Sequence, residues 1–185
     1  GLPNSPYILF VGRLNSIKGP DLLLQAFCQA REKLSNYHLV FAGPDEGMLI
    51  ILKKIAADAG LLDRVHFLGF LEGQAKARAL KSAELVVIPS RSEAMSIVVL
   101  EAGILGTPVL LTDQCGFDVI NNINGGLAVK ASAEGLRDGL INLTLDREKL
   151  KLMGKNLYKY VRERFGWDVI VNQYLNLYRG ILRLE

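Results

Sequence analysis

Residues 89–108 read PSRSEAMSIVVLEAGILGTP. A short apolar run, Leu85–Ile88, precedes this stretch and stops at Pro89, which predicts a buried strand followed by a polar loop. After the loop, apolar residues recur at helical spacing until Gly106-Thr107-Pro108 ends the pattern. The stretch therefore predicts a strand end, a loop, a helix and the start of another strand. The apolar positions of this helix are Ile97, Val98, Leu100, Ala102 and Leu105.

The same alternation of strand and helix extends on both sides of this stretch, which is typical of parallel strands joined by right-handed crossovers. We therefore predict an α/β fold with one doubly wound, mainly parallel six-stranded sheet of the Rossmann-like type, flanked by helices and followed by extra C-terminal helices. One domain over residues 1–185 is expected. The predicted strands are Tyr7–Val11, Tyr37–Ala42, Val65–Leu68, Leu85–Ile88, Val109–Thr112 and Leu127–Lys130. The other predicted helices are Pro20–Leu34, Met48–Ala59, Gly73–Ser82, Ala133–Leu145, Arg147–Glu163 and Trp167–Leu184.

The order of the strands decides which loops meet. In the common order 3-2-1-4-5-6, the first and fourth strands are neighbours, and a crevice opens beyond their carboxyl ends. The loops that follow these two strands are Gly12–Gly19 and Pro89–Ser96. We therefore expect Arg13 and Lys18 to face Glu93 across one crevice.

Two carboxylates, Glu93 in the loop and Glu101 in the helix, stand eight positions apart. Helical side chains lean toward the N-terminus of their helix, so Glu101 is predicted to border the same pocket as Glu93. The amides of residues 94–98 lie at the positive end of the helix dipole and favour an anion such as phosphate. Arg13 and Lys18 are placed to neutralise a diphosphate. Carboxylates beside such a site suit a phosphate attached to a group with hydroxyls, because carboxylates accept hydrogen bonds from hydroxyls.

Glycine and aromatic residues stand at the ends of the other strands. Gly12 follows the first strand, Gly43-Pro44 the second, and the segment Phe67-Leu68-Gly69-Phe70 stands at the end of the third. Exposed backbone there is suited to the edge of a flat ring, although turns and core aromatic residues give the same pattern. The loop after the first strand has neither the Gly-Lys-Ser/Thr order of a Walker motif nor a Gly-x-Gly-x-x-Gly fingerprint. ATPase and NAD-binding functions therefore lose their usual support.

The composition limits the remaining function classes. The net charge of +3 is spread without a Lys/Arg run, which argues against nucleic acid as a partner. Cys28 and Cys115 lie far apart, so we expect reduced thiols and a cytoplasmic protein without a disulfide. His38 and His66 lie in strand-like runs and are interpreted as packing residues. We therefore expect neither a protein-built metal site nor a cofactor.

The stretch and the segments around it match a known family over nearly the whole chain. The chain resembles the C-terminal, donor-binding domain of the group 1 glycosyltransferases (glycosyltransferase family 4), which are retaining enzymes with two Rossmann-like domains, the GT-B fold. The matching segments are VGRLNSIKGPDLLLQAF (11–27), HLVFAGP (38–44), RVHFLGFL (64–71), PSRSEAMSIVVLEAGILGTPVL with its Glu-x7-Glu motif (89–110), and FGWDVIVNQYLNLYRGIL (165–182).

This resemblance implies a role for each matching residue. Arg13 and Lys18 would hold the donor diphosphate and stabilise the leaving nucleoside diphosphate. Glu93 would contact the hydroxyls of the donor sugar or stabilise positive charge near its anomeric carbon, and Glu101 would accept from the ribose hydroxyls. Donor contacts through the backbone are implied for the amides of Ala94, Met95, Ser96 and Ile97 with the phosphates and for Phe67, Leu68 and Gly69 with the base, and Gly12 and Gly43 complete the candidate donor site.

The resemblance also implies the reaction. A sugar passes from a nucleotide-sugar donor to an acceptor with retention and without a bound metal, because a pair of cationic residues does the electrostatic work. The sequence departs from the family at Ala94-Met95-Ser96, where Gly-Phe-Gly or Gly-Leu-Pro is common. The donor sugar therefore stays open, as do the base and the acceptor, which is a sugar, a lipid or a polysaccharide.

The N-terminal acceptor domain of the family is not matched by this chain. We therefore expect this chain to bind donor without efficient transfer, and any membrane association to come from the missing domain. In such enzymes the last helix crosses back to that domain. Its apolar residues are accordingly expected to form an exposed patch or to drive self-association. They are Ile170, Tyr174, Leu177 and Tyr178.

Two alternatives stay open. One is a different enzyme on the same architecture, such as a nucleotide-sugar epimerase or a phosphorylase, and the other is a stand-alone nucleotide-binding or regulatory module. A retaining glycosidase, whose two carboxylates lie about 5 Å apart, is less favoured because it gives Arg13 and Lys18 no role.

Overall fold

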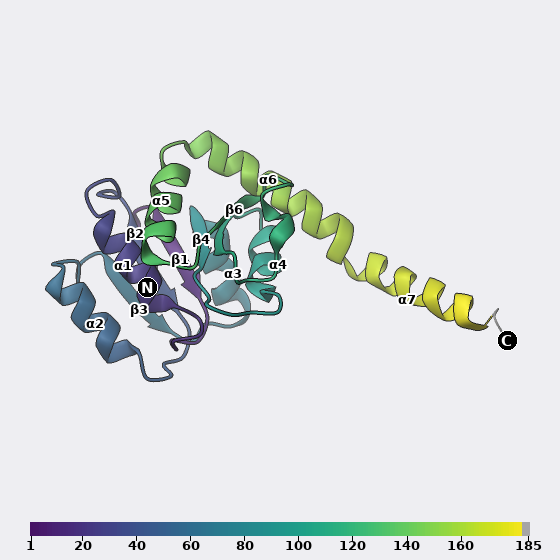
Figure 1. Cartoon of the computed structure of the whole chain (residues 1–185), viewed down its shortest axis with the longest axis horizontal. Coiled ribbons are helices and arrows are strands. Elements are labelled where there is room, and N and C mark those ends of the chain that lie inside the picture. Colours follow the sequence, from purple (N-terminus) through teal and green to yellow (C-terminus); the bar gives the residue numbers. More distant parts are fainter. Residues whose placement is uncertain (183–185) are drawn as a thin grey trace.

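The computed structural model describes residues 1–182 of the chain (Figure 1). Six strands alternate with helices in this part of the chain, and three further helices follow the last strand. The strands are β1 (Tyr7–Val11), β2 (His38–Ala42), β3 (Val65–Gly69), β4 (Leu85–Ile88), β5 (Val109–Thr112) and β6 (Gly126–Val129). The helices are α1 (Pro20–Gln29), α2 (Leu49–Asp58), α3 (Gly73–Ser82), α4 (Ile97–Ile104), the short 3-10 helix η1 (Asp118–Ile120), α5 (Ala133–Thr144), α6 (Arg147–Phe165) and α7 (Trp167–Leu182).

The strands form one sheet in the order β3-β2-β1-β4-β5-β6, and every neighbouring pair is parallel. This arrangement confirms the predicted fold class and the predicted strand order. The chain order runs from β1 outward to β3 on one side and from β4 outward to β6 on the other, so the strand order reverses between β1 and β4. These two strands pair directly, with Ile8 in register with Leu85. The loops that follow β1 and β4 consequently leave the sheet side by side at its carboxyl edge.

Both faces of the sheet are buried under helices. Successive residues of a strand point to opposite faces, and in β1 Ile8 and Phe10 belong to one hydrophobic cluster while Tyr7 and Leu9 belong to the other. The first cluster includes side chains of α1, α2 and α5, and the second includes side chains of α3, α4 and α6 (Figure 1). Burial on both faces explains why the strands are continuous apolar runs without alternation.

Several predicted boundaries differ from the structure, most of them by one or two residues and the first helix by more. The helix predicted to reach Leu34 ends at Gln29, and turns lead from there to β2. The Arg64 guanidinium donates to the carbonyl oxygens of Leu34 and Tyr37, which satisfies two acceptors of the segment between α1 and β2. The last strand begins at Gly126, because Gly126 is in register with Val109. The third strand continues to Gly69.

The last helix, α7, projects from the body of the domain (Figure 1). None of its residues is buried, and Trp167, Tyr174, Leu177 and Tyr178 are each more than half exposed. The expected exposed apolar patch is therefore present, although Ile170 is half-buried. The predicted end of this helix at Leu184 lies outside the described residues. No helix within residues 1–182 combines the length and the apolar character needed to cross a membrane.

The two histidines, interpreted as packing residues, contact each other at the start of β2 and β3. His38 Nδ1 lies 2.8 Å from His66 Nε2, and the two rings stack with their centroids 5.1 Å apart. Burial, together with the nearby His38 ring, lowers the pKa of His66 below its usual value of 6.5. The folded chain therefore resists protonation of His66.

This lowered pKa makes the stability of the chain depend on pH. Below about pH 6.5 the unfolded chain binds a proton at residue 66 more readily than the folded chain does, so the free energy of unfolding falls as the pH decreases. We expect urea denaturation of the wild type to show a larger loss between about pH 7.5 and pH 5.5 than that of His66→Gln, which cannot take the proton. Parallel pH profiles for the two proteins would contradict this prediction.

Candidate functional site

The loops after β1 and β4 are joined at the carboxyl edge of the sheet. The Arg91 amide donates to the Ile17 carbonyl oxygen over 2.8 Å, and the Arg91 guanidinium donates to both carboxylate oxygens of Asp21, at 2.9 and 2.6 Å. The hydrogen bonds to Asp21 and its negative charge raise the pKa of Arg91. Sequence reasoning did not single out Arg91, whose partner is visible only once the two loops are known to be adjacent. The predicted meeting of the two loops is present in the structure.

The backbones of these two loops touch at Gly19. Gly19 lies at the N-terminus of α1 with φ at +66°, in the left-handed region, and a β-carbon there would stand 2.1 Å from the Pro89 carbonyl oxygen. No side chain larger than hydrogen fits without separating the loops. This contact brings Lys18 within reach of the β4 loop.

Lys18 and Glu93 form an ion pair across the crevice. The Lys18 Nζ atom contacts Glu93 Oε1, and the Glu93 side chain is only 10% exposed. The second oxygen, Glu93 Oε2, is buried and has no hydrogen-bond partner among the described residues. Leaving a buried carboxylate oxygen without a hydrogen-bond donor costs free energy. Glu93 Oε2 would therefore bind a hydrogen-bond donor from a ligand or from water favourably.

The backbone amides before and at the start of α4 are partly free. The Ser96 amide donates to the Cys115 carbonyl oxygen over 3.2 Å, so it is engaged by the loop after β5. In contrast, the amides of Ala94, Met95 and Ile97 donate to no acceptor within residues 1–182. Three of the four amides expected to meet an anion are thus available, at the positive end of the α4 dipole.

The loop after β5 packs against the segment that precedes α4. Gly116 has φ at +61°, and a β-carbon there would stand 1.9 Å from the Ala94 carbonyl oxygen. The adjacent Cys115 is fully buried, and its thiol lies 3.3 Å from the Ile88 carbonyl oxygen. Burial raises the pKa of Cys115, and the negative charge of Glu93 adds to this effect. The thiol therefore stays protonated and serves as a packing group.

Arg13 does not join Lys18 at Glu93. Its guanidinium lies 3.1 Å from Glu46 Oε1, on the loop after β2, and its side chain is 57% exposed. Arg13 instead borders a cavity of about 320 Å³ between the loops after β1, β2 and β3. This cavity is lined by Gly12, Arg13, Gly43, Pro44, Phe70 and Lys76, among others.

The aromatic residue at this cavity is Phe70, which is 67% exposed. Phe67 stacks on Phe41 in the core with the ring centroids 5.2 Å apart, and neither Phe67, Leu68 nor Gly69 lines the cavity. Gly69 contributes by accepting a hydrogen bond from the Gly43 amide over 2.7 Å. Of the predicted segment Phe67-Leu68-Gly69-Phe70, only Phe70 lines the cavity, because β3 continues to Gly69.

Glu101 is paired with a residue that sequence reasoning missed. Its Oε1 atom lies 2.7 Å from Lys76 Nζ on α3, while its Oε2 atom is buried without a partner among the described residues. Glu101 does not line the cavity at Arg13; it lines a neighbouring depression of about 330 Å³ between α3 and α4. Lys76 borders both hollows, whereas Glu93 lines neither of them. The prediction that Glu93 and Glu101 border one pocket is therefore wrong.

Metal ligands do not gather at this edge. Within the described part of the chain, no three His, Cys, Asp or Glu side chains come together in a group that suits a metal ion. The charged groups of the site are instead three cations and their carboxylate partners. The pairs are Arg13–Glu46, Lys18–Glu93 and Lys76–Glu101.

The parallel sheet with its charged groups at the switch point defines a Rossmann-like α/β domain whose candidate site lies at the carboxyl edge of the sheet. Residues 2–160 match the family described as Glycosyl transferases group 1, and the chain belongs to this family. The resemblance in sequence is thereby confirmed.

Several relatives illustrate this membership. The chain is 34% identical over 174 residues to the uncharacterized glycosyltransferase MJ1607 of Methanocaldococcus jannaschii, covering 93% of the chain and 44% of that protein. It is 33% identical over 188 residues to a D-inositol 3-phosphate glycosyltransferase of Gordonia bronchialis, covering 95% of the chain and 40% of that protein. Sucrose-phosphate synthase of Thermosynechococcus elongatus superposes with a TM-score of 0.83 at 25% identity, over 100% of this chain and 47% of that one. The chain thus spans less than half the length of these relatives.

The contact at Gly19 predicts a specific loss of stability. In Gly19→Ala the new methyl group overlaps the Pro89 carbonyl oxygen, so we expect a loss of free energy of unfolding about 1–3 kcal/mol larger than positive φ alone would cause. Urea denaturation measures this loss. Gly60→Ala is the matched control, because Gly60 has φ at +68° and nothing within 4 Å of its β-carbon position. Equal losses in the two variants would show that the loops separate without cost.

Proposed function

We propose that this chain is the donor-binding half of a retaining glycosyltransferase that transfers a sugar from a nucleoside diphosphate sugar to an acceptor. One observation carries the proposal: the buried Glu93 carboxylate, held by Lys18, keeps an unpartnered oxygen, and Glu93 directly precedes the residues with free amides before and at the start of α4. An anion site adjoining a carboxylate acceptor suits a ligand that bears both phosphate and hydroxyl groups.

In this proposal the donor diphosphate occupies the space between Lys18 and the amides of Ala94, Met95 and Ile97. Lys18 and Arg13 offset the charge that builds up on the leaving nucleoside diphosphate as the bond to the sugar breaks. This electrostatic role needs no metal ion, since two cations and a helix dipole face the leaving group. Arg13 reaches the phosphates by turning away from Glu46, which its 57% exposed side chain is free to do.

Glu93 acts on the sugar. When Lys18 turns to the phosphates, the Glu93 carboxylate becomes available to accept from the donor-sugar hydroxyls or to stabilise positive charge at the anomeric carbon. Its buried position makes these interactions strong, because little water competes for the carboxylate.

The nucleoside is placed in the adjoining hollows. The cavity of about 320 Å³ offers the Phe70 ring and the backbone of Gly43 to the base. Glu101 has one oxygen free for the ribose hydroxyls, and Lys76 stands between the two hollows.

The other half of the enzyme supplies the acceptor site in this proposal. The exposed apolar side chains of α7 support this arrangement over a stand-alone module. Large apolar side chains such as Trp167 and Tyr174 are usually buried against a partner surface, and the other half of the enzyme provides such a surface. We place the reaction in the cytoplasm, and any attachment to a membrane in the other half.

A titration tests the donor site. We expect Lys18→Gln to weaken binding of the preferred nucleoside diphosphate by about 10-fold or more, because a charge-assisted hydrogen bond is lost, while the nucleoside binds as before. Glu101→Gln weakens both ligands, since the ribose is common to them. Calorimetry with UDP, GDP and ADP and with uridine, guanosine and adenosine measures these affinities and identifies the base.

The matched control is Lys151→Gln, which removes a lysine from an exposed ion pair with Glu148 elsewhere on the domain. This variant should bind like the wild type. Equal losses of diphosphate and nucleoside in Lys18→Gln would contradict the assignment of Lys18 to the phosphates, and a wild-type chain that binds no nucleoside diphosphate would contradict the proposed donor site.

A further inference from the structure

Glu46 forms an ion pair with Arg13, one of the two cations that the proposed donor diphosphate needs. Its Oε1 and Oε2 atoms lie 3.1 and 3.3 Å from the same Arg13 nitrogen. Its Oε2 atom also accepts from Asn15 Nδ2 over 2.6 Å. Both carboxylate oxygens are therefore engaged, by two residues of the loop after β1.

The backbone fixes this arrangement. The Leu14 amide donates to the Pro44 carbonyl oxygen over 2.9 Å, and the Glu46 amide donates to the Leu14 carbonyl oxygen over 3.2 Å. Nearby, a β-carbon on Gly43 would stand 1.8 Å from the Gly12 carbonyl oxygen, so the two loops are in direct contact. Glu46 is thus held beside Arg13 by the packing of the loops as well as by the ion pair.

Glu46 is ionised at neutral pH. The hydrogen bond from Asn15 and the charge of Arg13 lower the pKa of its carboxyl group. Glu46 therefore presents a full negative charge to Arg13 at the mouth of the cavity that Arg13 lines.

We propose that Glu46 is an internal competitor of the donor diphosphate for Arg13, and that it sets the affinity of the site for diphosphate. The inference rests on the proposed function, and it names a residue that weakens donor binding. A diphosphate that bonds to Arg13 must first replace the Glu46 carboxylate, so the free energy of the ion pair is subtracted from the free energy of binding.

Glu46 differs in this respect from Glu93. The Glu93 side chain is 10% exposed and keeps an oxygen free, whereas the Glu46 side chain is 40% exposed and has both oxygens bonded. Neutralising Glu46 therefore releases Arg13 without leaving a buried charge unpaired. The negative charge of residue 46 can therefore be removed by substitution while the rest of the site stays intact.

The test is the affinity of Glu46→Gln for inorganic pyrophosphate and for UDP, GDP and ADP, measured by calorimetry. Glutamine keeps an oxygen that accepts from Asn15 and loses only the charge. We expect pyrophosphate and the preferred nucleoside diphosphate to bind about 2- to 5-fold more tightly than to the wild type, the range set by exposed ion pairs. The gain should shrink in about 1 M NaCl, where the Debye length is ~3 Å. The nucleoside without phosphates should bind as before.

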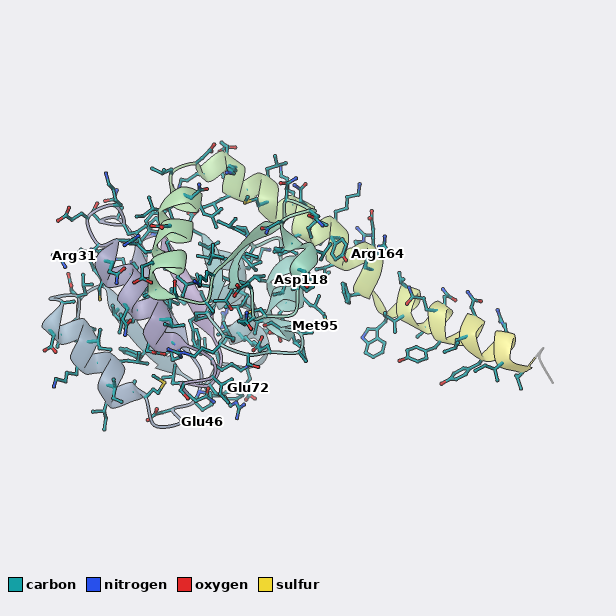
Figure 2. All side chains as sticks on the ribbon, in the orientation of Figure 1. Arg31, Glu46, Glu72, Met95, Asp118 and Arg164 are labelled. Carbon is teal, nitrogen blue, oxygen red and sulfur yellow. The ribbon has the colours of Figure 1, made fainter. Side chains whose placement is uncertain are left out.

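Two further variants make the result specific. Glu72→Gln is the matched control, because it makes the same change of charge at an exposed glutamate on the same side of the domain (Figure 2). This variant should leave the affinities unchanged. The double variant Arg13→Ala/Glu46→Gln should lose the gain, because no released arginine is present.

The outcomes separate this inference from the proposed function. Pyrophosphate binding that is equal or weaker in Glu46→Gln, or absent from both proteins, overturns the competition. If no nucleoside diphosphate binds to the wild type, the donor site is contradicted, yet tighter pyrophosphate binding to Glu46→Gln still supports the competition for Arg13.

Discussion

The carbonyl oxygen of Pro89 lies where a β-carbon on residue 19 would stand, and the geometry of the site depends on this contact. The parallel sheet places β1 beside β4, but neighbouring strands do not by themselves bring their loops into contact. At Gly19, and again where Gly116 meets the Ala94 carbonyl oxygen, backbone lies against backbone. Lys18 reaches Glu93 because three loops are packed at this distance, and a single methyl group at either glycine would separate them.

The charges of the site are arranged so that the ligand-free chain is already neutralised. Isolated cations gathered around one cavity would repel one another, and a buried carboxylate without a partner would be costly. Pairing each cation with a carboxylate removes both problems. Under the proposed function, binding of the donor diphosphate is therefore an exchange of partners at these cations. The free oxygens of Glu93 and Glu101 are what this pairing leaves over. The pairs are Arg13–Glu46, Lys18–Glu93 and Lys76–Glu101.

The sheet and the Lys18–Glu93 pairing could be predicted from the sequence, because both follow from the order of apolar runs and from the rule that ligands bind where the strand order reverses. The residues that were missed depend on other information. Lys76 meets Glu101 because α3 and α4 lie side by side, and Arg91 meets Asp21 because the loops after β1 and β4 are adjacent. Arg13 pairs with Glu46 because its long, exposed side chain can reach more than one carboxylate. No sequence pattern predicts which carboxylate it contacts.

The exposed helix α7 has a consequence for the dynamics of the chain. Because α7 buries no residue fully, and only its first turn is half-buried, most of it is held by its own hydrogen bonds and local propensity, and an isolated helix of its 16 residues is marginal in water. Its amide hydrogens should therefore exchange with solvent through fraying, independently of the unfolding of the sheet. Any protein surface that covers Trp167 and Tyr174 supplies the missing free energy, so the degree of order in α7 measures how completely that surface is docked.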